Sequence, residues 1–348
     1  MTLLHNTATA SIVARQSNFF ANNGSRIWDI RQCTVDTCPI DSSYYFYRVS
    51  LAANATLLAL FGISLISYVL TYGVTRRATA FTFALVSGVI LEILGYAGRL
   101  MSWKNQWAEP GFLMQIVCLT IAPAFMAGGI YLCLRRIVYA FGPENSRISP
   151  EAYTRIFIPC DILSLVLQAL GGGMASSASH QHKSTKSGDN IMVAGLSFQV
   201  ATLLVFMILC TDFALRTYRR HKSLGAAAFD QSPAFTSTRN SLKFKGFLVA
   251  LALATICIFW RSVYRVVELA QGWTGSLIKQ QDLFIGFEGV MVVVACLALN
   301  VFNPAFAFGS GMEGMGGLGS KRKARKNGEK SAERSASNSD GEAMKTAA

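Results

Sequence analysis

Two ionisable residues stand seven positions apart within an otherwise apolar stretch of the sequence. Glu92 and Arg99 are separated by about two helical turns, so both lie on one face of a helix. Glu288 lies in another apolar stretch. Ionisable groups inside a membrane are costly and mark substrate or ion pathways. We expect these side chains to line a polar pathway or pocket, with static pairing between helices as the alternative.

A third apolar stretch carries charges at the spacing of a single helical face. Arg261, Arg265 and Glu268 occupy positions i, i+4 and i+7. We expect this stripe to meet Glu92 and Glu288, while water solvates Glu268 near the membrane surface. Carboxylates exceed arginines within the apolar stretches by five to three. A cationic amphiphile is therefore favoured over an anionic one.

Polar residues of another stretch also share one face. Asp161, Ser164 and Gln168 follow an i, i+3, i+7 pattern. Three glycines follow them, Gly171, Gly172 and Gly173. Consecutive glycines weaken a helix, and they permit either close helix approach or an opened turn that faces a cavity. This segment is a second candidate for a polar pathway, with the glycines as candidate helix-opening residues.

Catalytic, cofactor and metal sites are not predicted. The sequence contains no nucleophile–base pair that stands out and no phosphate-binding loop of the G-x-x-x-x-G-K-[ST] type. Residues 309–314 spell G-x-G-x-x-G, but they follow an apolar stretch and not a strand. Because this motif binds a dinucleotide only between a strand and a helix, no dinucleotide site is predicted here. His180 and His182, with Asp189, lie in a polar segment where solvation is the expected state.

The elements that position these residues are seven long apolar runs. They lie at about 50–74, 79–102, 111–134, 155–176, 190–214, 246–269 and 283–306. Each reaches the roughly 20 residues that a helix needs to span a membrane. The chain is 52% hydrophobic and only 15% charged. Because backbone groups in lipid must be satisfied internally, we predict an all-α polytopic membrane protein, a bundle of seven transmembrane helices.

The basic residues predict the orientation of this bundle. Lys and Arg are retained on the cytosolic side of short loops. The segments after runs 1, 3 and 5 and the C-terminal tail hold 21 of them, against 8 in the N-terminal tail and the other segments. The N-terminus is therefore expected outside and the C-terminus in the cytosol. We predict an extracellular tail over 1–49, a membrane domain over 50–306 and a disordered basic tail over 307–348.

The soluble ends carry features that suit this orientation. Asn23 begins a sequon for N-glycosylation in the outer tail, whereas a second match at Asn54 lies inside the first run. Cys33 and Cys38 are expected in an oxidising compartment, where the two cysteines could form a disulfide or remain as two free thiols. The net charge of +13 places basic segments, such as 216–222 and 321–326, against anionic lipid headgroups. Nucleic acid is not an expected partner, and any protein partner is unknown.

Several of these segments resemble the fungal lipid-translocating exporter family, which includes sphingoid long-chain-base exporters and proteins conferring resistance to 7-aminocholesterol. The resemblance is carried by GYAGRL (95–100), IAPAFMAGGIYLCL (121–134), CDILSLVLQALGGGMA (160–175), RSVYRVVEL (261–269) and NVFNP (300–304). It covers roughly residues 44–305 and not the tails. The positions on family motifs are Glu92, Arg99, Asp161, Gln168, Arg261, Arg265 and Glu288.

The resemblance implies a seven-span protein, often of the plasma membrane, that exports amphipathic lipids or confers resistance to lipophilic toxins. An internal membrane such as that of the vacuole is the alternative location. A receptor or sensor of lipid or membrane stress is the alternative function, because a basic third cytosolic loop suits coupling to a cytosolic partner. A membrane-embedded enzyme is disfavoured, because no catalytic arrangement stands out in the sequence.

Overall fold

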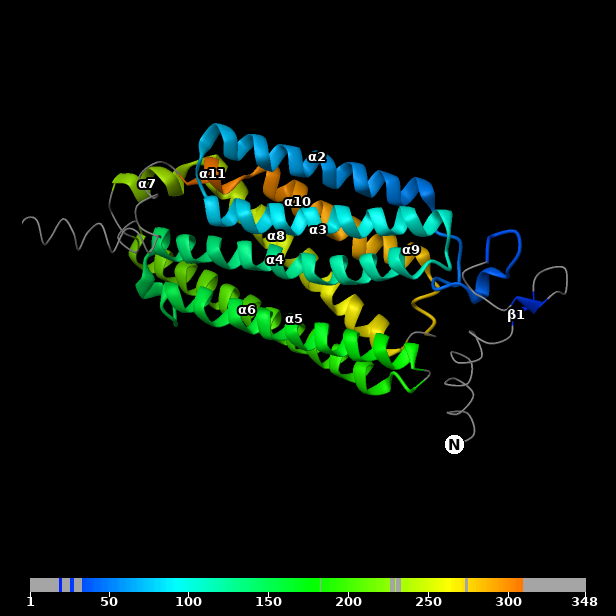
Figure 1. Ribbon diagram of the computed structural model, residues 1–348. Helices are drawn as coiled ribbons and strands as arrows, with labels where there is room; N and C mark the ends of the chain where they lie inside the picture. Colours follow the sequence, from blue (N-terminus) through cyan, green and yellow to red (C-terminus); the bar gives the residue numbers. More distant parts are fainter. Residues whose placement is uncertain are drawn as a thin grey trace, which may run out of the picture.

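Seven long apolar helices run side by side in the computed structural model, which describes residues 19–20, 26–27, 33–181, 183–225, 229, 233–272 and 275–308 (Figure 1). In chain order the spans are α2 (Leu51–Thr75), α3 (Thr79–Lys104), α4 (Glu109–Phe141), α5 (Pro150–His180), α6 (Lys186–Leu224), α8 (Leu242–Ala270) and the segment Gln281–Ala307. The predicted all-α bundle of seven spans is confirmed.

The seventh span is divided into four pieces. They are α9 (Gln281–Phe284), the π-helix η5 (Ile285–Val290), α10 (Met291–Val301) and α11 (Pro304–Ala307). Asn303 begins α11, because its side chain accepts a hydrogen bond from the Ala305 amide at 2.9 Å. A π-helical turn is rare and often marks a functional site, and the predicted continuous span over 283–306 does not include one.

Short elements lie outside the spans. They are the antiparallel strands β1 (Phe19–Phe20) and β2 (Arg26–Ile27), the 3₁₀ turns η2 (Ile40–Ser42) and η3 (Pro143–Asn145), and helix α7 (Pro233–Asn240). The connection between α2 and α3 is only three residues long, and Arg76 and Ala78 in it have positive φ angles of 51° and 54°. This tight reversal holds α2 and α3 antiparallel.

Two helices extend well beyond the apolar runs that predicted them. α4 continues from the expected 134 to Phe141, and α6 from 214 to Leu224. The extension of α6 contains three arginines and one lysine, and Arg216 pairs with Asp212 one turn earlier at 3.0 Å. A helix needs apolar residues only where it crosses lipid, so hydropathy gives the span and not the end of the helix.

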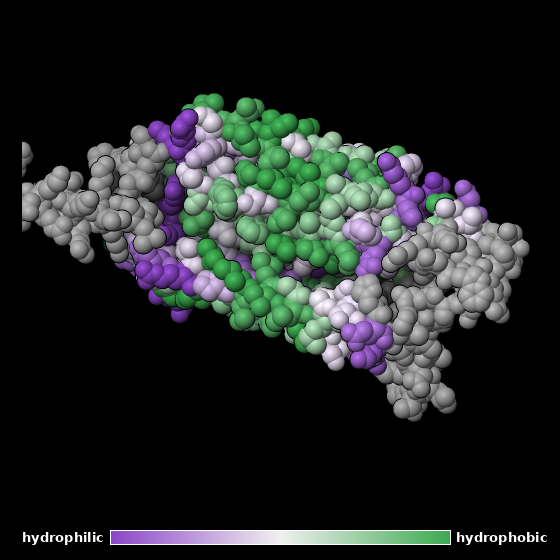
Figure 2. Space-filling view, viewed as in Figure 1, coloured by the Kyte–Doolittle hydropathy of each residue, from purple (hydrophilic) through white to green (hydrophobic). Residues whose placement is uncertain are grey.

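The spans form a closed ring. Neighbours around the ring are α2, α3, α4, α5, α6, α8 and α10, and α10 returns to contact α2. α8 also contacts α4 across the interior, and it crosses the bundle obliquely in Figure 1. Figure 2 shows a green apolar band around the middle of the visible face, with hydrophilic residues at both ends. This band is the surface that faces lipid.

Residues 33–50 form an N-terminal cap at the end of the bundle where α2 and α4 begin. The Cys33–Cys38 disulfide packs against Trp107, whose indole nitrogen donates to the Ser42 hydroxyl at 2.9 Å. The Tyr45 hydroxyl, buried against the bundle, donates to Gln115 Oε1 at 2.8 Å. Of the two states left open for the cysteines, the structure shows the disulfide.

Candidate functional site

An ion pair between two spans lies fully inside the bundle. The guanidinium of Arg261 on α8 lies 2.5 Å from a carboxylate oxygen of Glu288 on η5, and each side chain is 1% exposed. The same guanidinium donates to the carbonyl oxygen of Leu119 on α4. Through these two contacts Arg261 joins α8 to η5 and α4. Arg261 Nε and Glu288 Oε2 have no hydrogen-bond partner among the described residues, so the buried pair does not use all of its hydrogen-bonding capacity.

A second guanidinium extends this pair along α8. Arg265 Nη1 lies 2.6 Å from Glu268 Oε2, and Arg265 Nε lies 3.7 Å from Glu288 Oε2. Arg265 Nη2 also donates to the hydroxyl of Thr120 on α4 at 3.4 Å. The expectation that water solvates Glu268 was wrong. The residue is buried in the bundle because Arg265, one turn before it, binds its carboxylate there.

The carboxylate of Glu92 on α3 has a different environment. Its side chain is 0% exposed, yet neither carboxylate oxygen accepts a hydrogen bond from any residue that the structure describes. Its charged neighbours are Arg261, Glu288 and Arg265, which act on it through space. A buried carboxylate without a donor is unfavourable when ionised. The Glu92 carboxylate therefore has no hydrogen-bond donor within the described part of the chain.

These residues form one group, which we call the charged cluster: Glu92, Arg261, Arg265, Glu268 and Glu288. They come from α3, α8 and η5, the three spans whose charges were expected to converge. Helix α4 contributes the Leu119 carbonyl and the Thr120 hydroxyl. Since α4 also contacts α3 and α8, a polar headgroup inside the bundle would meet all four elements at this place.

Arg99 lies apart from the charged cluster, although the sequence placed it on the same face as Glu92. Its Nε donates to Asn54 Oδ1 at 2.7 Å and its Nη2 to the Tyr47 hydroxyl at 3.1 Å. Its guanidinium carbon lies 4.1 Å from the centre of the Phe284 ring. Among the described side chains, no carboxylate forms an ion pair with it. Neutral acceptors and an aromatic face stabilise this cation instead.

A second polar region lies between α4, α5 and α6. Gln168 on α5 donates to Gln199 Oε1 on α6 at 3.0 Å. The Ser164 hydroxyl donates to the backbone carbonyl of Asp161, whereas both carboxylate oxygens of Asp161 lack a hydrogen bond from the described part of the chain. The buried hydroxyl of Tyr131 on α4 is its electrostatic neighbour. This region is separate from the charged cluster.

The three glycines of α5 differ from one another. A Cβ at Gly171 would overlap the backbone of Met192 and Gly188 on α6, whereas one at Gly173 would meet nothing within 4 Å. Gly172 has only the Met192 sulfur nearby, at 3.9 Å. Helix α5 continues without a break through all three. Of the two expectations, close helix approach is therefore seen at Gly171, and an opened turn is not.

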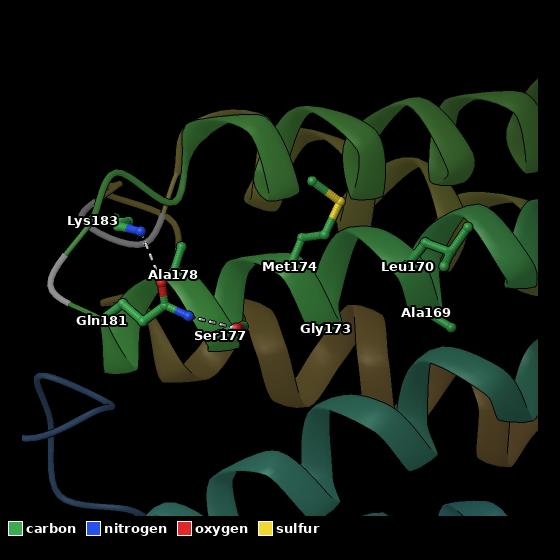
Figure 3. A pocket seen from close by; sticks show the side chains of 8 residues that line it. All are labelled: Ala169, Leu170, Gly173, Met174, Ser177, Ala178, Gln181 and Lys183. Atoms are coloured by element: carbon green, nitrogen blue, oxygen red, sulfur yellow. Dashed lines mark hydrogen bonds between the residues drawn. The ribbon is translucent and has the colours of Figure 1, made fainter.

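A groove follows one face of α5 from Ala169, before these glycines, to Lys183 in the loop after the helix (Figure 3). It has a volume of about 470 Å³ and is lined by Ala169, Leu170, Gly173, Met174, Ser177, Ala178, Gln181 and Lys183. Its polar end is held together by hydrogen bonds, since Lys183 donates to Gln181 and Gln181 to Ser177. An apolar groove with one polar end matches the polarity of a molecule that has one apolar chain and one polar end.

The charged cluster is closed in this state. None of its members lines the groove on α5, and both of its guanidiniums are paired. Glu92 is 0% exposed, so a molecule from outside the bundle can contact it only if the helices around it move. Glu288 lies on the π-helical turn η5, an element that is often found at functional sites.

Sequence reasoning missed the neutral partners of the charges. Asn54, Tyr47 and Thr120 bind arginines, but their types and spacing resemble those of any apolar helix or loop. A signal did exist for η5, because Gly286 and Gly289 flank Glu288. Gly289 is required by packing, since a Cβ there would meet the Leu57 side chain and the Tyr96 hydroxyl.

Some predicted features lie outside the described residues. Asn23 and the basic segment 321–326 belong to them, as does His182, so their roles stay predictions. Within the described ranges, no group of three or more His, Cys, Asp and Glu side chains is arranged to hold a metal ion.

The arrangement is that of a polytopic helical membrane protein with an ionic interior, and the chain belongs to the family described as RTA1 like protein, which matches residues 85–311. The expected resemblance to fungal lipid-translocating exporters is confirmed. A relative in Saccharomyces cerevisiae, named sphingoid long-chain base transporter RSB1, is 36% identical over 279 residues. The match covers 74% of this chain and 72% of the relative.

Two further relatives come from the same yeast. Protoporphyrin uptake protein 1 is 31% identical, over 65% of this chain and 70% of its own length. Protein RTM1 is 28% identical, over 79% of this chain and 81% of its own length. No solved structure matches the chain. The relatives carry names of different activities, so family membership by itself leaves the substrate open.

Proposed function

We propose that this protein moves amphipathic lipids across the membrane and that its substrates are cationic single-chain lipids of the sphingoid long-chain base class. The observation that carries the proposal is Glu92, a buried carboxylate beside two arginines that no hydrogen-bond donor of the described chain reaches. An ammonium headgroup would supply both the donor and the charge. The relative named as a sphingoid long-chain base transporter supports this substrate class.

In this proposal the headgroup travels through the bundle while the hydrocarbon chain stays in lipid. The residues assigned to the pathway are Glu92, Arg99, Asp161, Gln168, Arg261, Arg265 and Glu288. Glu92 is the carboxylate among them that no hydrogen-bond donor of the described residues reaches, so an ammonium group gains most there. Asp161, which faces the Tyr131 hydroxyl, is a second place at which an ammonium group would bind. The arginines position the carboxylates, and the negative charge of the carboxylates disfavours anionic lipids.

The test is leaflet exchange by the purified full-length chain in liposomes, with a fluorescent long-chain base as the probe. We expect the wild-type chain to accelerate exchange. Glu92→Gln keeps the size of the side chain and removes its charge, so exchange should fall about tenfold or more, the equivalent of one charge-assisted hydrogen bond. Arg147→Gln, which removes an exposed pair with Asp212 at one end of the bundle, serves as the matched control.

A receptor or sensor would give a different result. Saturable binding of the long-chain base without leaflet exchange would contradict transport and favour a protein that signals to a cytosolic partner. In cells, Glu92→Gln and Arg265→Met should both lose resistance to added long-chain bases while the protein remains at the surface. Unchanged resistance in both variants would exclude the polar pathway.

The proposal includes a location and an orientation. We place the protein in the plasma membrane with its N-terminal cap outside, so that export runs from the cytosol to the medium. The extension of α6 and the tail then face the cytosolic leaflet, where each Lys or Arg near the surface gains about 1 kcal/mol from anionic headgroups. Anionic lipids at that surface are the proposed partners of the basic segments.

A further inference from the structure

The charged cluster is short of one positive charge. It contains two guanidiniums, those of Arg261 and Arg265, and three carboxylates. Glu288 and Glu268 are each within 2.6 Å of a guanidinium nitrogen, and Glu92 is the carboxylate left over. An uncompensated charge in a site that excludes water and lipid headgroups is highly unfavourable. Something must neutralise Glu92 in the closed state.

The groups that face Glu92 from other elements cannot do so. The thiols of Cys118 on α4 and Cys296 on α10 act on it through space, as does the hydroxyl of Tyr96 on its own helix. These groups are neutral or become negative, and none donates a hydrogen bond to it. Arg99 lies two turns along α3, roughly 10 Å by helical rise, and its guanidinium is bound to Asn54 and Tyr47.

We propose that Glu92 is the proton-binding site of a proton–lipid exchanger: it holds one proton in the closed state and gives it up when a cationic headgroup takes its place. This inference rests on the proposed function and adds the driving force to it. A proton and an ammonium group each bring one positive charge, so the charge of the cluster is the same with either occupant. Binding of one therefore excludes the other.

The exchange is balanced without any covalent step. The O–H bond of the Glu92 carboxyl breaks, the proton passes to water on the side to which the cluster has opened, and the ammonium N–H groups then donate to the carboxylate. On the other side the order is reversed. One lipid cation moves in one direction for each proton in the other, so a proton gradient directed inward drives lipid outward.

The experiment uses a single-chain quaternary ammonium amphiphile as the probe, because it is positively charged at every pH and has no neutral form that could carry protons through the bilayer. It has no N–H groups, so it replaces the proton on Glu92 by its charge alone. Binding to the purified full-length chain is measured over a pH series. While Glu92 is protonated in the free protein, the dissociation constant should fall about tenfold for each unit of rising pH, since one proton is released for each cation bound. Glu92→Asp should keep this dependence and Glu92→Gln should lose it.

A second measurement needs no variant. Liposomes that contain the chain and a trapped pH-sensitive dye receive the same amphiphile on one side, and proton movement is compared with amphiphile movement. One proton for each amphiphile supports the exchanger. Exchange without proton movement, or wild-type binding that is independent of pH, overturns the proton site and leaves lipid transport intact. Absence of binding and exchange for both this amphiphile and the fluorescent long-chain base overturns the proposed function together with this inference.

Discussion

At the level of single residues, the buried arginines have two kinds of binding partner. Arg261 binds a carboxylate and a backbone carbonyl, whereas Arg99 binds a neutral amide, a phenol and an aromatic face. The planar guanidinium permits both, because it presents five donors and stacks on rings. A cation buried by neutral groups stays fixed when carboxylates change their charge. Arg99 is therefore suited to hold the structure around Glu92 while Glu92 exchanges its proton.

The Arg261–Glu288 pair should show the asymmetry of a buried ion pair. Arg261→Met or Glu288→Met alone leaves one charge without its partner, and each should cost about 3–5 kcal/mol of unfolding free energy. The double variant should cost clearly less than the sum of the two. Thermal unfolding of the four proteins in one detergent measures the coupling. Additive losses would show that the two side chains do not depend on each other.

Tyr45 in the N-terminal cap makes stability depend on alkaline pH. Burial raises the pKa of its phenol from 10.0 to about 12, and the nearby Arg99 partly opposes this. A pKa raised on folding gives stability that is complete below pH 10.0 and is lost as pH rises toward 12. Unfolding midpoints measured between these values should therefore fall more steeply for the wild type than for Tyr45→Phe. Equal slopes would contradict the buried phenol.

The sequence predicted the convergence of four members of the charged cluster. It wrongly placed the fifth, Glu268, in water, and it grouped Arg99 with Glu92 although Arg99 lies apart from the cluster. Position within a span fixes the depth of a residue, so Glu92, Arg261, Arg265 and Glu288 could be placed together before any coordinates. The depth of a residue and its helical face do not predict which side chain will bind it. Arg99 was misplaced for that reason, since its ligand Tyr47 comes from the cap, where no periodicity constrains the chain.

At the scale of elements, α5 and α6 pack as a pair with backbone contact. Gly171 and Gly188 each approach the backbone of the other helix, and a Cβ at either would overlap it. Small residues let helices approach this closely in lipid, where packing replaces the hydrophobic effect. The pair is consequently rigid at Gly171. Two residues further on, at Gly173 on the other side of α5, no atom of a neighbouring helix lies within 4 Å of the added Cβ position.

Two glycines of α5 provide a matched test of this packing. Gly171→Ala should destabilise the protein by about 1–3 kcal/mol, because α5 and α6 must separate to admit the methyl group. Gly173→Ala adds the same atom in open space and should be neutral or stabilising by up to about 1 kcal/mol, through higher helix propensity. Thermal unfolding in detergent compares them. Equal effects would show that helix propensity alone governs both sites.

The spans were predictable and their interruptions were not. Apolar runs of about 20 residues gave all seven spans, because lipid imposes both length and composition. The ends of α4 and α6 were set too early, since a helix continues freely into water. Gly286 and Gly289 beside Glu288 are a local signal for η5, whereas the contacts of Gly289 with Leu57 and Tyr96 join distant spans and leave no pattern in the sequence.

At the scale of the whole molecule, the two ends of the bundle differ in charge. The end with the short connection at Arg76 and Arg77 also holds the basic extension of α6 over 216–222. The other end holds the disulfide-bonded cap and few basic residues between the spans. Retention of Lys and Arg in the cytosol and formation of disulfides outside it point to the same orientation.

Two sequons, Asn23 and Asn54, allow this orientation to be tested within one chain. With the cap outside, Asn23 is glycosylated in cells, so the full-length protein should shift in mobility after treatment with a glycosidase, and Asn23→Gln should abolish the shift.

Asn54 is buried in α2, where it accepts from Arg99 and donates to the Ser50 carbonyl. Asn54→Gln should therefore leave the glycosylation shift unchanged while lowering thermal stability, because a buried arginine loses its acceptor. An unshifted wild-type chain with a C-terminal tag accessible to protease outside intact cells would reverse the orientation, and the direction of lipid movement with it.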